Sequence, residues 1–289
     1  MGRNKDNKKK ESAALRFLYK SAFGRMLLKP LISVGVSNFV GRFMDSKLSK
    51  PLIGRFVKKN GINLDDFYSD SFGCFNDCFC RKIKEGKRPI DTDPCALISP
   101  CDALLSAYRI DADTRLSVKE SVYSIKDLLV NPDLVARYED GVCLVFRLCV
   151  NHYHRYIYLD SGNKGGNLFI KGKLHTVRPI ALESVPVFKR NCREYTVLHT
   201  DNFGDVLQME VGAMLVGKIN NFHDECEFER GEEKGCFLYG GSTVILLLEK
   251  NTAELDGKFF EATDRGEEMD VVMGERIGYK YGAVPETNK

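Results

Sequence analysis

The sequence has no hydrophobic run long enough to cross a membrane. Its longest uncharged apolar stretch, residues 30–40, falls far short of the roughly 20 residues that a membrane-spanning helix needs. No secretory signal peptide is predicted, because Arg16, Lys20 and Arg25 interrupt the apolar core that such a peptide requires. The Lys-rich N-terminus, which includes Asp6, also fits an Arg-rich, acid-poor mitochondrial presequence badly. We therefore expect a soluble or peripherally bound globular protein.

Histidine is scarce, and the cysteines lack the spacing of a metal site. The chain has five His and ten Cys. Cys74, Cys78 and Cys80 lie close together, but no His or second Cys pair follows at zinc-site spacing. We predict no metal site. Without a secretion signal, we expect the thiols to be reduced and mostly to behave as small buried hydrophobes.

Charge is unevenly distributed along the 289 residues, although the net charge is only +3. Residues 1–60 contain 15 Lys and Arg but three acidic side chains, a net charge of +12, so the remainder carries −9. Nucleic acid and anionic lipid both fit such a basic segment. Apolar residues are interleaved with the basic ones: Leu15, Phe17, Leu18, Phe23, Met26, Leu27, Leu28, Leu31, Ile32, Phe39 and Phe43.

This basic and apolar pattern is typical of amphipathic helices that lie in a membrane interface. We therefore predict that residues 1–61 contact an anionic membrane surface and that nucleic acid is not a partner. The alternative is a solvated pair of helices packed on the main domain.

Helices are expected first and strands afterwards. Periodicity predicts a helix over residues 12–29, with Pro30 as its stop, and another over residues 64–85. From residue 96, short β-rich runs divided by Gly, Asn and Asp indicate a barrel- or sandwich-like core, interrupted by a short helix at 124–129. The predicted fold class is α+β, with N-terminal amphipathic helices in residues 1–61 and a β-rich core in residues 62–289.

The most informative local feature is Gly240-Gly241-Ser242-Thr243, which precedes an apolar run over residues 244–248. The run predicts a buried strand, so Ser242 stands at a turn-to-strand junction. A Ser after a flexible Gly can attack the preceding carbonyl with its own hydroxyl, which turns the amide into an ester. β-Elimination then splits the chain and converts Ser242 to a pyruvoyl group. The plain alternative is an ordinary Gly-rich turn.

Further motifs stand in order between about residue 72 and residue 278. They are Phe75-Asn76-Asp77, Arg81-Lys82, Arg88-Pro89-Ile90-Asp91, Ser99-Pro100-Cys101-Asp102, Tyr153-His154-Arg155, Phe188-Lys189-Arg190-Asn191 with Arg193, and the eight residues 210–217. Together with the Gly-Gly-Ser-Thr sequence, they resemble the phosphatidylserine decarboxylase family. The order of several motifs around one cleavage sequence is far more specific than any single one.

The resemblance implies a proenzyme that cleaves itself between Gly241 and Ser242. Its cofactor would be the covalent pyruvoyl group made from Ser242. That group would form a Schiff base with the amine of phosphatidylserine and act as the electron sink as CO2 leaves, as a bound carbonyl cofactor does. The product would be phosphatidylethanolamine.

By resemblance, Asp102, His154 and Ser242 form the self-processing constellation. A neutral Ser hydroxyl needs a base, and His is the natural base near neutral pH. His154 matches the His of the family's Tyr-His-Arg motif, and Asp102 matches the Asp of Ser-Pro-x-Asp, which would orient and charge the imidazole. Alternation along a predicted strand over residues 150–159 would put His152 on the same face as His154, where it could assist.

Two positions depart from the family pattern. Many members have a second His three residues after the His of Tyr-His-Arg, and that second His is often given the triad role. Here the position is Ile157, so His154 would serve alone or with His152. The family also commonly has Gly after the Asp, where this chain has Ala103.

The resemblance thus implies an autoprocessing carboxy-lyase, phosphatidylserine decarboxylase, bound peripherally at the cytoplasmic face of the plasma (inner) membrane. Strands on both sides of the cut should keep the fragments 1–241 and 242–289 together, and a homodimer is one further assembly to consider. The alternatives are a pyruvoyl-dependent decarboxylase of a soluble amino acid, a non-catalytic lipid-binding homologue, and a Ser hydrolase without self-cleavage. No nucleophile-elbow pattern surrounds Ser242 to favour the hydrolase.

Overall fold

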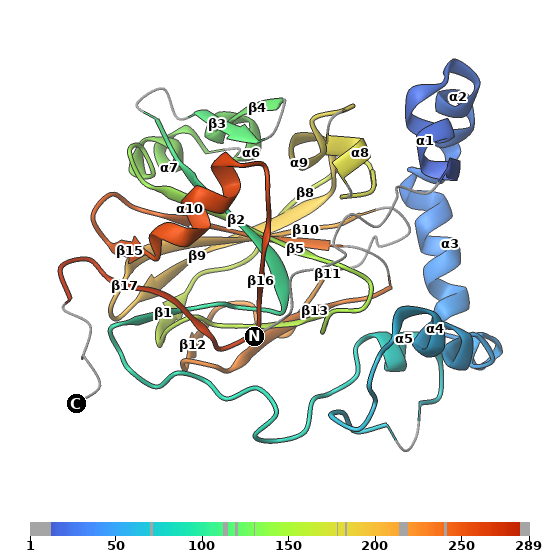
Figure 1. The fold of residues 1–289 in the computed structure, drawn as a ribbon, viewed down its shortest axis with the longest axis horizontal. Coiled ribbons are helices and arrows are strands. Elements are labelled where there is room, and N and C mark those ends of the chain that lie inside the picture. Colours follow the sequence, from blue (N-terminus) through green and yellow to red (C-terminus); the bar gives the residue numbers. More distant parts are fainter. Residues whose placement is uncertain are drawn as a thin grey trace.

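A nine-stranded antiparallel sheet forms the centre of the computed structural model (Figure 1). The structure describes residues 13–69, 72–111, 115–118, 121–129, 131–177, 179–182, 184–213, 219–239 and 242–283. The strands follow the order β12-β7-β9-β10-β14-β5-β2-β16, and β8 also pairs with β9. Their bounds are β2 Ala103–Arg109, β5 Val142–Leu148, β7 Gly162–Lys164, β8 Leu168–Ile170, β9 Arg193–Thr200, β10 Gly204–Val211, β12 Cys226–Phe228, β14 Ser242–Leu248 and β16 Met269–Val271.

Three smaller sheets complete the strands of the described residues. The first has the order β1-β17-β15, the second β11-β13-β6, and the third pairs β3 with β4. Their bounds are β1 Ala96–Ile98, β3 Arg115–Val118, β4 Ser121–Ser124, β6 Arg155–Ile157, β11 Ile219–Asn221, β13 Glu233–Phe237, β15 Ala253–Leu255 and β17 Arg276–Lys280.

Helices α1 to α5 precede the first strand in the chain, and α6 to α10 lie between strands. Figure 1 shows α1 to α4 along one side of the molecule, with α8 beside α1 and with α6, α7 and α10 farther away above the sheet. Within the described residues, no helix is both long and apolar enough to cross a bilayer. The bounds are α1 Ala13–Lys20, α2 Ala22–Leu31, α3 Val34–Met44, η1 Lys47–Ser49, α4 Leu52–Asn60, α5 Phe75–Phe79, α6 Ile125–Leu128, α7 Pro132–Arg137, α8 Pro179–Leu182, α9 Val187–Arg190 and α10 Gly257–Asp264.

The predicted α+β class, with N-terminal helices before a β-rich core, is confirmed. The strand order of the large sheet runs from β12 to β16 without closing on itself among the described residues. The more specific barrel- or sandwich-like description therefore stays a prediction.

Both faces of the large sheet are buried, and the side chains of β14 pack alternately on the two faces. Val244, Leu246 and Leu248 belong to an apolar cluster that includes residues of the small sheets. Ile245 and Leu247 point to the other face and join a cluster with residues of the covering helices. Because successive side chains of a strand alternate between faces, a strand buried on both faces reads as a continuous apolar run.

The prediction of a single helix over residues 12–29 is wrong in its extent. The chain forms α1 and α2, separated at Ser21, whose hydroxyl accepts a hydrogen bond from Gly24 N at 2.8 Å. This capping bond starts a new helix at a residue that the apolar periodicity passes over. The second helix then includes Pro30 in its last turn, rather than ending before it. Ser12, the first residue of the predicted helix, lies outside the described residues.

The predicted helix over residues 64–85 is reduced to the five residues of α5. The two flanks of this segment pair with each other instead, through Tyr68 N to Lys82 O at 2.9 Å and Lys84 N to Asp66 O at 2.9 Å. These non-local bonds satisfy backbone groups that a continuous helix would have paired locally. The short helix expected at 124–129 is present as α6, with the Ser124 hydroxyl accepting from Lys126 N.

Candidate active site

Three strand ends meet at one end of the large sheet. Ser242 begins β14 and pairs with Leu148, the last residue of β5. One step along, Arg147 of β5 pairs with Thr243 on one side and with Leu104, near the start of β2, on the other. Neighbouring strands lie about 4.8 Å apart, so the starts of β2 and β14 are separated by two such steps.

The residues predicted for the site gather at this end of the sheet. Asp102 immediately precedes β2, and His152 and His154 lie in the connection between β5 and β6. Ser242 is the first residue of β14. The topology therefore brings all four residues to the same end of the large sheet, although they are up to 140 residues apart in the sequence. Gly241, the other residue of the predicted cleavage bond, lies outside the described residues.

The Ser242 hydroxyl is in an unusual position for a polar group. Its side chain is 0% exposed, and its Oγ has no hydrogen-bond partner among the described residues. It shares its face with Leu148, Val244 and Leu246, which belong to the apolar cluster beneath the small sheets. A buried hydroxyl without a partner costs free energy, and groups of this kind are concentrated where chemistry requires them.

Three donors hold the Asp102 carboxylate. Arg88 grips it with two bonds, Nε to Oδ1 at 2.9 Å and Nη2 to Oδ2 at 2.6 Å. The backbone N of Met273 donates to Oδ1 at 2.9 Å. The carboxylate raises the pKa of Arg88, mainly through these hydrogen bonds. Such a two-pronged pair fixes the direction of the carboxylate as well as its place.

The two histidines are held in opposite tautomers by the backbone. His154 Nδ1 lies 2.9 Å from the carbonyl oxygen of His152, which can only accept, so Nδ1 carries the hydrogen. In the neutral ring, the lone pair is then on Nε2, the form that a general base requires. His152 Nδ1 instead accepts from Cys149 N at 3.2 Å, which places its hydrogen on Nε2.

The charge of Asp102 acts on the His152 imidazole. Burial lowers the pKa of the His152 imidazole, and the charge of Asp102 is the largest influence opposing that shift. The His154 side chain is 0% exposed and packs on Phe79, with ring centroids 4.0 Å apart. His152 therefore senses the charge of Asp102, and its carbonyl oxygen accepts from His154 Nδ1.

The prediction that both histidines share one face of a strand is wrong. Residues 149–152 form a turn, closed by His152 N to Cys149 O at 2.9 Å, and β6 begins only at Arg155. The alternation of a strand therefore does not apply to residues 152 and 154. What orients His154 is the carbonyl of His152, an arrangement that periodicity could not reveal.

Three contributors to this region were not assigned a role from the sequence. Arg88 was recognised only as part of a motif, and its bond to Asp102 joins residues 14 positions apart. Phe79, which covers His154, and Tyr239, which precedes the Gly-Gly-Ser sequence, were not singled out. Phe79 and Tyr239 pack edge to face, with ring centroids 5.6 Å apart. Only the position of Tyr239 near the cleavage motif offered a signal.

No group of three or more His, Cys, Asp or Glu in the described part of the chain could hold a metal ion. Most of the free thiols are buried, and burial raises the pKa of Cys101 and Cys143 well above the usual value. Cys80 Sγ donates to Phe237 O at 2.9 Å, close to the cleavage motif in sequence.

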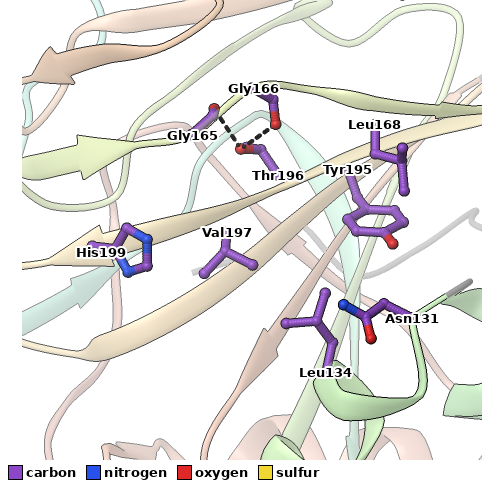
Figure 2. A pocket seen from close by; sticks show the side chains of 9 residues that line it. All are labelled: Asn131, Leu134, Gly165, Gly166, Leu168, Tyr195, Thr196, Val197 and His199. Carbon is purple, nitrogen blue, oxygen red and sulfur yellow. Dashed lines mark hydrogen bonds between the residues drawn. The ribbon is translucent and has the colours of Figure 1, made fainter.

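A cavity of about 260 Å3 lies elsewhere on the molecule (Figure 2). Its lining consists of Asn131, Leu134, Gly165, Gly166, Leu168, Tyr195, Thr196, Val197 and His199. Tyr195 of β9 pairs with Met209 of β10, which in turn pairs with Ile245 of β14, so the cavity is two strands away from β14. None of the predicted site residues lines it. The end of the sheet that carries Ser242 is therefore the better candidate.

Comparison with known proteins gives the same answer as the motifs. A family model described as phosphatidylserine decarboxylase matches residues 75–279. Phosphatidylserine decarboxylase proenzyme 2 of Clostridium acetobutylicum is 41% identical over 272 residues, which are 94% of this chain and 93% of the relative. A phosphatidylserine decarboxylase proenzyme of Clostridium botulinum is 40% identical over 287 residues, covering 96% and 97% of the two chains.

A third relative, the phosphatidylserine decarboxylase proenzyme of Clostridium kluyveri, is 40% identical over 273 residues and 92% of each chain. The family model includes Asp102, His154 and Ser242 within its bounds. The resemblance read from the ordered motifs is confirmed. This chain belongs to the phosphatidylserine decarboxylase family.

Proposed function

We propose that this protein is a phosphatidylserine decarboxylase that matures by cutting itself between Gly241 and Ser242. The observation that carries the proposal is the buried Ser242 hydroxyl, which has no hydrogen-bond partner among the described residues and stands at the start of a strand. Family membership supplies the reaction class, and the gathering of Asp102, His152 and His154 at the same sheet end supplies the acid–base groups.

Self-cleavage would proceed by acyl transfer to Ser242 Oγ, then β-elimination, and then hydrolysis. Ser242 Oγ attacks the carbonyl carbon of Gly241 while His154 Nε2 takes its proton, and the amide C–N bond breaks as the nitrogen receives a proton. Removal of the Ser242 Cα proton and rupture of its Cβ–Oγ bond then release the carboxylate of fragment 1–241. Cβ of the resulting enamine takes up a proton and becomes a methyl group. Water then replaces the nitrogen at Cα of residue 242, so that ammonia leaves and Cα becomes the keto carbon of the pyruvoyl group.

The residues around Ser242 fit this role. The apolar surroundings keep bulk water from the ester, so elimination is favoured over simple hydrolysis. His154 Nε2 carries the lone pair that accepts the hydroxyl proton, because its Nδ1–H is donated to His152 O. The Asp102 carboxylate, fixed by Arg88 and Met273, stabilises the positive charge that develops on the histidines.

In the mature enzyme, the pyruvoyl group supplies an electron sink for the loss of CO2 from the bound amino acid head group. His154 Nε2 is the group that we assign to return a proton to the substrate carbon. His152, with its hydrogen on Nε2, is placed to donate rather than to accept and would assist by orienting His154.

The fragments would stay together after the cut because of how β14 is placed. This strand lies between β10 and β5, and it forms a pairing ladder with each of them. The small fragment, 242–289, would also keep the pairings of β16 with β2 and of β17 with β1. Separating the fragments would expose these ladders and the apolar face of the sheet.

The proposal that the protein binds an anionic membrane surface rests on the N-terminal helices. Their exposed large apolar side chains are Phe17, Phe23, Met26, Leu27, Val34, Phe39, Phe43, Leu48 and Leu52, with Phe39 at 76% and Leu48 at 77%. Basic residues stand among them, so apolar insertion and attraction to anionic lipid act together. We propose peripheral binding at the cytoplasmic face of the plasma (inner) membrane.

The same helices also pack on the core, so the alternative of a docked helical pair is part of the answer. Tyr19 of α1 is 3% exposed, and its hydroxyl lies 3.3 Å from His175 Nδ1 and accepts from Thr176 N at 3.2 Å. One side of the segment 1–61 is therefore fastened to the proposed catalytic domain, 62–289, while another side carries the exposed apolar residues.

One observation favours a second candidate, a non-catalytic lipid-binding homologue. Ile157 is 1% exposed, and its N donates to Pro100 O at 2.9 Å, so this position lies against the segment that carries Asp102. An Ile there provides no base. A soluble amino acid as substrate is less well supported, because it would leave the apolar surface of the N-terminal helices without a partner.

Product analysis separates the candidates. Vesicles containing phosphatidylserine, incubated with the purified protein, should yield phosphatidylethanolamine and CO2, and the Ser242→Ala protein should yield neither. The lipid-binding homologue predicts binding to the same vesicles without any product from the wild-type protein. Release of CO2 from free serine, but not from the vesicles, would favour the soluble substrate.

A further inference from the structure

The short helix α5 lies between the N-terminal helices and the segment that precedes the proposed cleavage bond. It is five residues long, and Phe75, Asn76, Cys78 and Phe79 are buried. Its first turn is capped by Asp77, whose Oδ2 accepts from Gly73 N at 2.9 Å and Cys74 N at 3.1 Å. So short a helix has little stability of its own, and its position depends on what it contacts.

The side-chain amide of Asn76 donates one hydrogen bond and accepts another. Its Nδ2 donates to Asp45 Oδ1 at 2.7 Å, at the end of α3. Its Oδ1 accepts from the backbone N of Tyr239 at 3.1 Å. The carboxylate can only accept and the amide N can only donate, so the two partners fix which way the amide faces. Asn76 therefore bridges the N-terminal helices and the chain three residues before Ser242.

Aromatic packing reinforces the same bridge. The Tyr239 ring meets Phe75 edge to face, with centroids 4.9 Å apart and an interplanar angle of 88°. Phe56 of α4 also packs edge to face on Phe75, with centroids 4.9 Å apart and an interplanar angle of 67°. Edge-to-face pairs of this kind hold rings in a preferred direction, beyond the free energy of burying their surface.

The helix is also fastened to the N-terminal segment at a point that does not involve Tyr239. Phe75 N donates to the hydroxyl of Ser49 at 2.8 Å, and Ser49 is fully buried. The one hydrogen of that hydroxyl lies within reach of two carbonyl oxygens, Ser46 O at 2.7 Å and Met44 O at 3.0 Å. Ser49 thus offers a matched control, since it anchors the same helix without contacting the cleavage segment.

We propose that Asn76 is a positioning residue for self-cleavage, which holds the Tyr239 amide and ties it through Asp45 to the end of α3. The inference rests on the proposed self-processing at Ser242. Attack on the Gly241 carbonyl needs the hydroxyl and the carbonyl in one geometry, and small misplacements at such a site cost large factors in rate. Tyr239, which Asn76 holds, is two residues before Gly241 in the sequence.

The test is a cycle of four proteins. In Asn76→Asp, a carboxylate still accepts from Tyr239 N, but it faces Asp45 as a like charge. In Asp45→Asn combined with Asn76→Asp, the amide introduced at position 45 donates to the carboxylate introduced at position 76, so both bonds can form again. Asp45→Asn alone keeps an acceptor for Asn76 Nδ2. The cycle measures a coupling energy rather than the effect of a single change.

The rate of appearance of fragments 1–241 and 242–289 is followed after cell-free synthesis. We expect roughly tenfold slower cleavage for Asn76→Asp and recovery to within about threefold of wild type for the double variant. Ser49→Ala should lower the melting temperature while changing the cleavage rate less than about threefold. Melting temperatures are measured with Ser242→Ala added to every variant, so that each is compared as an uncut chain.

Two results would overturn the assignment of Asn76. One is a wild-type rate in Asn76→Asp, and the other is a double variant that is no faster than Asn76→Asp. Cleavage rates that simply follow melting temperature, Ser49→Ala included, would equally reduce Asn76 to a structural residue. A wild-type chain that never splits would instead contradict the proposed function, and the inference would fall with it.

Discussion

Most large apolar side chains of the central sheet are buried, whereas many of those on the N-terminal helices are exposed. In β14, all seven residues are buried, on both faces of the strand. In α3, Phe39 is 76% exposed, and in α2 Phe23 is 60% exposed. Scattered apolar residues on a surface need no explanation, but nine large exposed ones in helices that also carry many basic residues indicate a site for a membrane or a partner.

This difference suggests that the two regions carry separable tasks. The sheet end with Ser242 would carry the chemistry, and the helices would bring the protein to its lipid substrate. The two regions are nevertheless joined, because Asp45, Ser49 and Phe56 of the helical segment contact α5. Removal of residues 1–60 would therefore disturb both, and point substitutions are the sharper way to separate them.

Apart from loss of the Ser242 hydroxyl itself, the largest effect is expected at the buried His154. His154→Ala should slow self-cleavage by about 10²–10⁴-fold, the range of a lost general base. Vesicle binding of the uncut protein should not change. His199→Ala serves as the control, since His199 is exposed and pairs with Asp205 at 2.6 Å, away from Ser242. Cleavage is followed by intact mass at fixed times.

The same experiment tests the histidine assignment. Asp102→Asn should slow cleavage strongly, because the charge that stabilises the imidazolium is lost. His152→Ala should have the smaller effect, since its carbonyl, which orients His154, is retained. Normal cleavage in His154→Ala together with failure in His152→Ala would show that the base was wrongly chosen.

The next effect is expected on the helices. Replacing Phe23, Met26 and Phe39 by Ser should weaken binding to anionic vesicles by at least about tenfold. Each Phe side chain that becomes buried in the membrane contributes on the order of 2 kcal/mol to the binding free energy. Activity on phosphatidylserine in vesicles should fall more than activity on a dispersed short-chain analogue. Phe169→Ser is the matched control, since Phe169 is 48% exposed on β8, outside the helices.

Salt and lipid composition separate the two contributions to binding. Each basic residue near an anionic surface contributes about 1 kcal/mol, and salt screens it. Binding that is equal on neutral and anionic vesicles would make apolar insertion the dominant contribution. Retained binding in the triple Ser variant would contradict the membrane role of the exposed residues.

The smallest effect is expected on the free energy of unfolding, at the contact between Tyr19 of α1 and His175 of the core. Burial lowers the pKa of His175 to about 4, from 6.5. The unfolded chain therefore takes up a proton at higher pH than the folded one, so stability is lost as pH falls from 6.5 toward 4. Between pH 7 and 5.5 the loss should be about 1 kcal/mol in the free energy of unfolding.

His175→Gln provides the comparison for that pH effect, because a Gln oxygen can accept from Tyr19 without titrating. Denaturant unfolding at both pH values should show a smaller fall for the variant than for wild type. An equal fall in both proteins would mean that other groups account for the acid sensitivity, and that the Tyr19–His175 contact does not.

Local signals predicted the parts of the molecule that depend on neighbouring residues. The apolar run after Ser242 became β14, and Ser124 capped α6 as its residue type favours. The site residues Asp102, His154 and Ser242 were named from motifs, and the sheet places them at one end. Their catalytic roles stay predictions.

Non-local contacts account for what the sequence missed. The apolar periodicity of residues 64–85 predicted a helix, yet Phe67 bridges to Ile83 and folds the segment back on itself. The hydrogen bond that holds the backbone N of Tyr239 depends on Asn76, 163 residues earlier in the chain. No periodicity or spacing encodes contacts between residues so far apart.

Intact mass of the purified protein tests self-cleavage at Ser242 most directly. We predict two fragments, 1–241 and 242–289, with the smaller one blocked at its N-terminus by a pyruvoyl group. For Ser242→Ala we predict a single uncut chain. A wild-type chain that stays whole, or a Ser242→Ala chain that still splits after Gly241, would contradict maturation through the Ser242 hydroxyl.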